Sequence, residues 1–115
     1  MKDLGELRQH VAKFALERDW DQFHSPKNLT MALSVEVAEL MEHFQWLSEE
    51  QSRNLDSETL AKVAKEIADV QVYLVRLADV LSIDILKTVS IKMQENAEKY
   101  PADKVRGSAK KYDQY

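Results

Sequence analysis

The stretch SVEVAELMEHFQW, from Ser34 to Trp46, combines a helical repeat of apolar residues with two glutamates on or beside its apolar face. At about 100° per residue, the helix around this stretch has one apolar stripe, which contains Leu29, Leu33, Val37, Leu40 and Phe44. Glu36 falls within roughly 40° of Leu40 on this stripe, and Glu39 lies at its edge. A helix that only packed into a core would carry apolar residues at both positions. The two glutamates therefore need an explanation.

The same arrangement recurs further along the chain, around KEIADV. A second apolar stripe at helical spacing contains Val63, Ile67, Val70, Leu74, Leu77 and Leu81. Glu66 and Asp69 lie along its flank with the i, i+3 spacing that Glu36 and Glu39 have, so each pair faces one way. Consecutive helices joined by a short loop most simply pack antiparallel. We therefore expect all four carboxylates to meet.

Four carboxylates without basic partners in a half-buried place would repel one another and would be costly to desolvate. Neither helix carries four basic residues on that face. A hard divalent cation removes the conflict, and all-oxygen ligands suit Mg²⁺ or Mn²⁺. The sequence thus predicts a metal site of Glu36, Glu39, Glu66 and Asp69. The alternative is a set of solvated surface acids, since single Glu-x-x-Glu pairs are common on helices.

The rest of the chain predicts one all-α domain covering residues 1–115. Only two glycines and two prolines occur, and residues with high helix propensity dominate. We expect four helices, at about 4–19, 28–47, from 56 or 57 to 81, and from 82 or 84 to 99. Asn28 is a good N-cap for the second of these helices. Residues from about 103 onward form a basic tail that can be mobile.

Composition narrows the classes of function. The net charge of −4, from 16 basic and 20 acidic residues, gives no support to binding of a nucleic-acid polymer. No apolar run approaches the length of a membrane span, and the first residues do not resemble a signal peptide. The absence of cysteine excludes a thiolate nucleophile and a cysteine metal site. We therefore expect a cytoplasmic protein that contacts no membrane.

Nearly the whole chain also resembles the MazG-like group of all-α nucleoside triphosphate pyrophosphohydrolases. EVAELMEHFQW followed by KEIADVQVYLVRLAD resembles the signature of that group, Glu-x-x-Glu and then Glu-x-x-Asp. RDWDQFHSPKNL, KMQENAEKYP and GSAKKY fit its dCTP pyrophosphatase branch. The resemblance implies a four-helix MazG-like bundle with Mg²⁺ as cofactor and Mn²⁺ as a possible substitute. It also implies cleavage of dCTP or a modified dCTP to the monophosphate and pyrophosphate, which clears nucleotide pools.

The resemblance implies roles for single residues as well. The four acids would be catalytic, and Glu39 is our choice of general base, although the sequence alone does not decide which acid it is. Trp20, His24 and Trp46 would line the base pocket. Tyr73 would face the sugar, and Lys92 and Asn96 would contact phosphates. The alternatives are a hydrophobic staple that fixes the loop for Trp20, core or interface packing for Trp46, and core packing for Tyr73. Arg106, Lys110 and Lys111 would close over phosphates if the tail orders, whereas His10 and His43 have no predicted partner.

Assembly and alternative functions complete the predictions. Ala68, Val72 and Val75 point away from the second stripe, which favours an oligomer interface. The resemblance implies a homotetramer whose neighbouring subunits contribute to each base pocket, with a dimer as the alternative.

Rival functions are a sister enzyme acting on dUTP or phosphoribosyl-ATP and a non-catalytic regulatory or interaction bundle. A di-iron protein is disfavoured, because no Glu-x-x-His pair occurs at the acidic positions.

Overall fold

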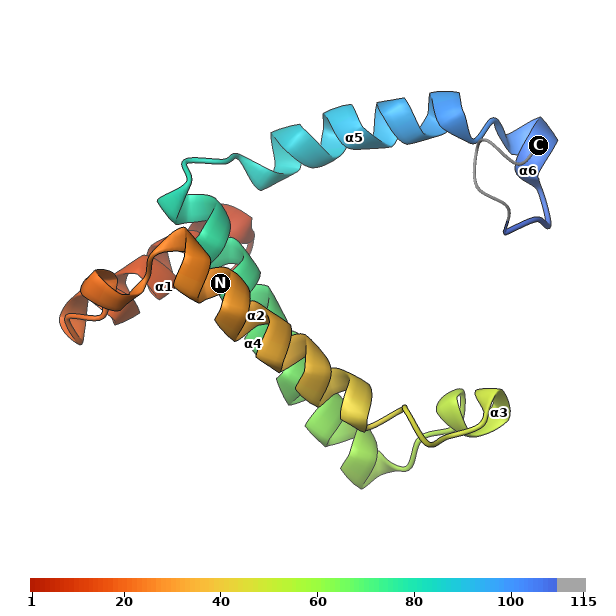
Figure 1. Cartoon of the computed structure of the whole chain (residues 1–115), viewed down its shortest axis with the longest axis horizontal. Coiled ribbons are helices and arrows are strands. Elements are labelled where there is room, and N and C mark those ends of the chain that lie inside the picture. Colours follow the sequence, from red (N-terminus) through yellow and green to blue (C-terminus); the bar gives the residue numbers. More distant parts are fainter. Residues whose placement is uncertain (110–115) are drawn as a thin grey trace. The chain divides into compact units, whose positions relative to one another are not determined.

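The computed structural model describes residues 1–109, which are helical with no β-strand in that range (Figure 1). The chain divides into two units. The first, Met1–Ser82, contains α1 (Leu4–Glu17), the 3₁₀ helix η1 (Asp21–Phe23), α2 (Pro26–Glu42), α3 (Glu49–Ser52) and α4 (Ser57–Val80). The second begins at Ile83 and contains α5 (Ile85–Lys99) and α6 (Ala102–Val105). The predicted all-α class is confirmed, and no described helix is long and apolar enough to cross a membrane.

Short polar side chains set the starts of the four longer helices. Each N-cap residue accepts a hydrogen bond from the backbone N–H three residues later, which satisfies one of the free donors of the first turn. These N-caps are Asp3, Ser25, Asp56 and Asp84. The predicted bounds of α4 and α5 are confirmed to within one residue, because Asp56 and Asp84 are strong capping residues that the sequence reveals.

The bounds of α2 differ from the prediction at both ends. Ser25, not Asn28, is the N-cap, because Pro26 fits the first helical position and Ser25 is extended. The Asn28 side chain instead donates to the Phe23 carbonyl at 3.1 Å, which ties η1 to the helix. At the other end, α2 stops at Glu42 rather than near Leu47. The next residues form tight turns, in which the backbone N–H of Phe44 donates to Met41.

The core of the first unit lies where α4 contacts both α2 and α1. Figure 1 shows α2 and α4 side by side and antiparallel, as the sequence predicted. Leu29 of α2 and Val63 of α4 are buried there, at 1% and 5% exposure. The two helices therefore bring their acidic positions to one interface.

The apolar stripes were predicted only in part. Val75, which the sequence placed on an outer interface face, is 2% exposed and belongs to the core. Val37, Ile67, Leu74 and Leu81, which the sequence placed within the stripes, are 43–53% exposed. The reason is that α1 also packs on α4, so the buried surface of α4 extends around the helix to Val75 and Ala78.

The four longer helices, α1, α2, α4 and α5, correspond to the four that the sequence predicted. Two four-residue helices, α3 and α6, were not predicted; a capping box between Ser48 and Gln51 stabilises the first of them. Because α5 lies in the second unit, a single domain with one four-helix bundle stays a prediction.

Candidate metal centre and adjoining cavity

The structure brings three of the four predicted acids into one cluster. Glu36 and Glu39 lie one turn apart on α2, and Glu66 lies on the antiparallel α4. One carboxylate oxygen from each of the three lies within 4.8 Å of the other two. Oxygens on opposite sides of one Mg²⁺ are about 4.2 Å apart, so small side-chain rotations would let these three share an ion.

Two oxygens of this cluster are buried without a partner. Glu36 Oε2 and Glu66 Oε2 are inaccessible to solvent and form no hydrogen bond in the described part of the chain. No lysine or arginine among residues 1–109 pairs with Glu36, Glu39 or Glu66. A buried carboxylate oxygen without a donor is costly. The donor set is all oxygen and pairs with no lysine or arginine of the described residues, so it fits a hard divalent cation.

The pKa of Glu36 reflects the same repulsion between neighbouring carboxylates. Burial raises the pKa of the Glu36 carboxyl, and the neighbouring carboxyl of Glu39, followed by those of Asp69 and Glu66, raises it further. Like charges that share a site oppose ionisation. The carboxylates of this site therefore repel one another unless one of them is protonated or a cation binds between them.

Asp69 and His43 complete the surroundings of the cluster. Asp69 is exposed and lies outside the three-acid group, but it lines the same cavity as Glu36. His43, at the end of α2, places Nε2 3.7 Å from Glu66 Oε1. No partner was predicted for His43 from the sequence. Its position four residues after Glu39 was the available signal, because residues so spaced share a helix face.

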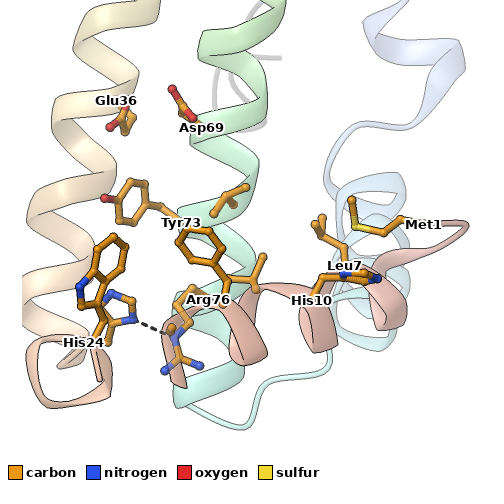
Figure 2. Close-up of a pocket in the computed structure, with 13 residues that line it drawn as sticks. Met1, Leu7, His10, His24, Glu36, Asp69, Tyr73 and Arg76 are labelled. Carbon is orange, nitrogen blue, oxygen red and sulfur yellow. Dashed lines mark hydrogen bonds between the residues drawn. The ribbon is translucent and has the colours of Figure 1, made fainter. Parts of the chain in front are cut away.

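A cavity of about 490 Å³ adjoins the acids within the first unit. Glu36 and Asp69 lie at its acidic part, and the aromatic side chains of Trp20, His24 and Tyr73 also line it. Figure 2 shows Glu36 on α2 and Asp69 on α4 near one another, with Tyr73 between them and His24. The size and the mostly apolar lining with a few polar groups are those of a small-molecule site.

The aromatic side chains of this cavity contact one another. The Trp20 ring meets Phe14 edge-on, with centroids 5.6 Å apart, and lies tilted against His24 at 6.4 Å. Trp20 remains 44% exposed, so part of its ring is free to contact a ligand. Trp20, His24 and Tyr73, which the sequence assigned to the base and the sugar, therefore share one cavity with Glu36 and Asp69.

The cavity is also lined by a buried arginine whose role was not predicted from the sequence. Arg76 is 8% exposed, and it donates to His24 Nδ1 at 3.0 Å and to Asp21 Oδ1 at 2.7 Å. The signal was present, because Arg76 continues the face of Asp69 and Tyr73 at i, i+4 and i+7. Its partners lie more than 50 residues earlier in the chain, and no local pattern predicts that contact.

The other predicted ligand contacts belong to Trp46 and to residues of the second unit. Trp46 is 87% exposed, so core packing within its own chain is wrong for it. Lys92 and Asn96 lie on α5 in the second unit, where Lys92 pairs with Glu95 at 3.6 Å. Arg106 follows α6, and Lys110 and Lys111 lie outside the described residues. The ligand contacts assigned to these residues stay predictions.

The chain is similar to known proteins in sequence and in structure. The sequence model of the MazG-like family matches residues 31–114. The chain is 43% identical to dCTP pyrophosphatase 1 of Rattus norvegicus and 41% identical to that of Homo sapiens, each over 111 residues. These alignments cover 95% of this chain but only 65% of each relative, so the chain spans about two thirds of their length. The crystal structure of a pyrophosphatase from Archaeoglobus fulgidus is similar with a TM-score of 0.80 and 41% identity, over 84% of this chain and 91% of that one.

Proposed function

Because the chain belongs to the MazG-like family, we propose that it is a divalent-metal-dependent nucleoside triphosphate pyrophosphohydrolase. The proposed reaction cleaves a deoxynucleoside triphosphate to the monophosphate and pyrophosphate. The proposed substrate is dCTP or a modified dCTP, since the relatives that align with nearly the whole chain are named dCTP pyrophosphatases. The biological role would be the removal of unwanted nucleotides from the pool.

One observation carries the proposal: carboxylates with buried, unpartnered oxygens lie beside a cavity with aromatic walls. A triphosphate is itself strongly anionic, so an acidic site can bind it only through cations. The cavity has room for a base and a sugar, with Trp20 available for stacking. The acids and the aromatic groups thus match the two ends of a nucleotide.

In the proposed mechanism, Glu36, Glu39, Glu66 and Asp69 would hold Mg²⁺, or Mn²⁺ in its place. The bound ion would offset the charge of the phosphates and lower the pKa of a water molecule. Glu39 would take a proton from the water as its oxygen forms a bond to the α-phosphorus. The bond from that phosphorus to the bridging oxygen breaks in line, and pyrophosphate leaves with the electron pair.

The remaining residues would hold the substrate. Trp20 would stack on the base, His24 would hydrogen-bond it, and Tyr73 would limit the space at the 2′ position of the sugar. Lys92 and Asn96 would contact the β- and γ-phosphates. Trp46 is 87% exposed and does not line this cavity, so we propose that it closes the base pocket of a neighbouring subunit.

That role for Trp46 depends on assembly, which we propose to be a homotetramer, with a dimer as the alternative. Large apolar side chains remain exposed on α2, α4 and α5, which favours a partner surface. These include Met31, Val35, Ile67, Leu74, Leu86, Val89, Ile91 and Met93. A cytoplasmic location stays a prediction.

A panel of nucleotides with Mg²⁺ tests the proposed function. We expect equimolar monophosphate and pyrophosphate from the preferred pyrimidine deoxynucleotide and slower cleavage of the matching ribonucleotide, because Tyr73 restricts the 2′ position. The panel includes dCTP, 5-methyl-dCTP, dUTP and phosphoribosyl-ATP, so that preference for either of the last two would identify a sister activity. Absence of cleavage of every triphosphate with both Mg²⁺ and Mn²⁺ would leave the non-catalytic bundle as the better account.

A further inference from the structure

Arg76 is the buried charged residue of the described chain, and its guanidinium is held from three sides. Besides its hydrogen bonds to His24 and Asp21, its Nη1 lies 3.6 Å from Asp79 Oδ2. Asp79 in turn accepts from Arg8 at 3.3 Å. A buried arginine without partners would be very costly. The network therefore fixes the position and the orientation of Arg76.

The hydrogen bond to His24 has a chemical consequence. A guanidinium only donates, so His24 Nδ1 must accept and cannot carry a hydrogen. In the neutral ring the hydrogen must then lie on Nε2. Burial lowers the pKa of His24, and the positive charge of Arg76 lowers it further, against the smaller opposing effect of Asp21. The ring is thus kept neutral with one defined tautomer.

The second ring nitrogen is the one left for a ligand. His24 lines the cavity, and Nε2 forms no hydrogen bond with any other group among residues 1–109. In Figure 2 the hydrogen bond from Arg76 ends at one ring nitrogen of His24, and the other ring nitrogen lies on a different side of the ring. The cavity therefore contains a fixed donor rather than a group that can either donate or accept.

We propose that Arg76 is a positioning residue that fixes His24 as the Nε2–H tautomer, so that the cavity selects a pyrimidine whose ring atom N3 is a hydrogen-bond acceptor. This inference rests on the proposed function and defines its base recognition. N3 of cytosine is such an acceptor, whereas N3 of uracil and thymine carries a hydrogen; O2 accepts in all three bases and therefore does not discriminate between them. A ring nitrogen that donates would meet the Nε2–H as a second donor, which leaves both groups unpaired.

The direct test is the tautomer of His24 in the wild-type protein, read from the nitrogen shifts and ring-proton couplings in long-range ¹H–¹⁵N NMR spectra. The chain has three histidines, and loss of one set of signals in His24→Ala assigns them. We expect Nδ1 without hydrogen and Nε2 with hydrogen at neutral pH. A spectrum with hydrogen on Nδ1 of His24 would overturn the proposal, and this measurement needs no substitution at Arg76.

Arg76→Met provides the second test, with Arg8→Met as the matched control. Arg8 shares the Asp79 partner but does not contact His24. In Arg76→Met we expect a mixture of His24 tautomers and a KM for dCTP about 3- to 10-fold higher, with kcat nearly unchanged. Arg8→Met should change neither. Unchanged tautomer and KM in a folded Arg76→Met would contradict the inference.

The two proposals fail separately. If the wild type cleaves no triphosphate, the proposed function is wrong, and with it the assignment of a pyrimidine ligand; the spectrum then still decides whether Arg76 fixes His24. If the wild type cleaves dCTP and Nδ1 carries the hydrogen, only the role of Arg76 is wrong. As a finer readout, 3-deaza-dCTP lacks the N3 acceptor. Its KM should exceed that of dCTP in the wild type by more than in Arg76→Met.

Discussion

Glu39→Gln is expected to lower kcat by about 10²- to 10⁴-fold while the helices remain folded. The carboxylate of Glu39 belongs to the three-acid group, and the proposed mechanism uses it both to hold a cation and to take the proton of the attacking water. The neutral amide of Gln has nearly the same shape but does neither task well. Release of pyrophosphate from the preferred nucleotide and the helical circular dichroism signal measure the two quantities.

A matched control separates this effect from a general change of charge on α2. Glu42 is exposed on the same helix, three residues away and outside the cluster. Glu42→Gln removes the same charge and should leave kcat within a factor of about two, because surface substitutions rarely matter. Wild-type turnover in Glu39→Gln would remove Glu39 from the site, whereas a loss in both variants would point to the charge of the helix instead.

Glu36→Gln is expected to change activity and stability in opposite directions. Loss of a cation ligand should lower kcat/KM by about 10²- to 10³-fold. Without divalent cations, however, the variant should be more stable than the wild type by about 1 kcal/mol. The reason is that Glu36 Oε2 is buried without a donor, and a Gln amide adds hydrogens that the neighbouring carboxylates can accept.

The stability difference should depend on pH with a defined sign. The pKa of Glu36 is raised in the folded protein by burial and by its acidic neighbours, so the folded state binds this proton more tightly than the unfolded state does. The stabilisation of the folded state by protonated Glu36 is present below the ordinary pKa of a glutamate and is lost as pH rises through the raised pKa of Glu36. The gain from Glu36→Gln should therefore grow as pH rises from the ordinary pKa of a glutamate through the raised pKa of Glu36.

Denaturant unfolding in the presence of a chelator measures this gain, and addition of Mg²⁺ or Mn²⁺ should reverse it. A cation that binds only the folded wild type stabilises it by mass action. A variant that is less stable than the wild type at every pH would mean that the Glu36 carboxylate has a stabilising partner. The claim that these carboxylates repel one another without a cation would then be wrong.

The sequence predicted the parts of the fold that depend on local signals. Asp56 and Asp84 mark helix starts chemically, and the repeated acid pairs at i, i+3 predicted which helix faces meet. The end of α2 at Glu42 was not predictable in this way, because no glycine or proline marks it and the apolar repeat continues to Phe44. Val75 was misplaced for a related reason: the stripe of α4 describes contact with α2 but does not show that α1 packs on another side.

The same distinction between local signals and distant contacts applies to the residues of the candidate site. Glu36, Glu39 and Glu66 could be predicted as a group, because periodicity fixes each pair and one antiparallel contact joins them. Arg76 could not, because its role depends on how the segment around Asp21 and His24 packs against α4. Such a contact joins a loop to a distant helix, and helical periodicity carries no information about it.

Anomalous diffraction from bound Mn²⁺ shows whether the acidic cluster holds a cation. Crystals grown with Mn²⁺ and measured at the manganese absorption edge should show an anomalous difference peak between the carboxylates of Glu36, Glu39 and Glu66. The same crystals of Glu36→Gln should show a weaker peak or none. Manganese bound elsewhere with no peak at these three carboxylates, in a protein that cleaves triphosphates with Mn²⁺, would contradict the account.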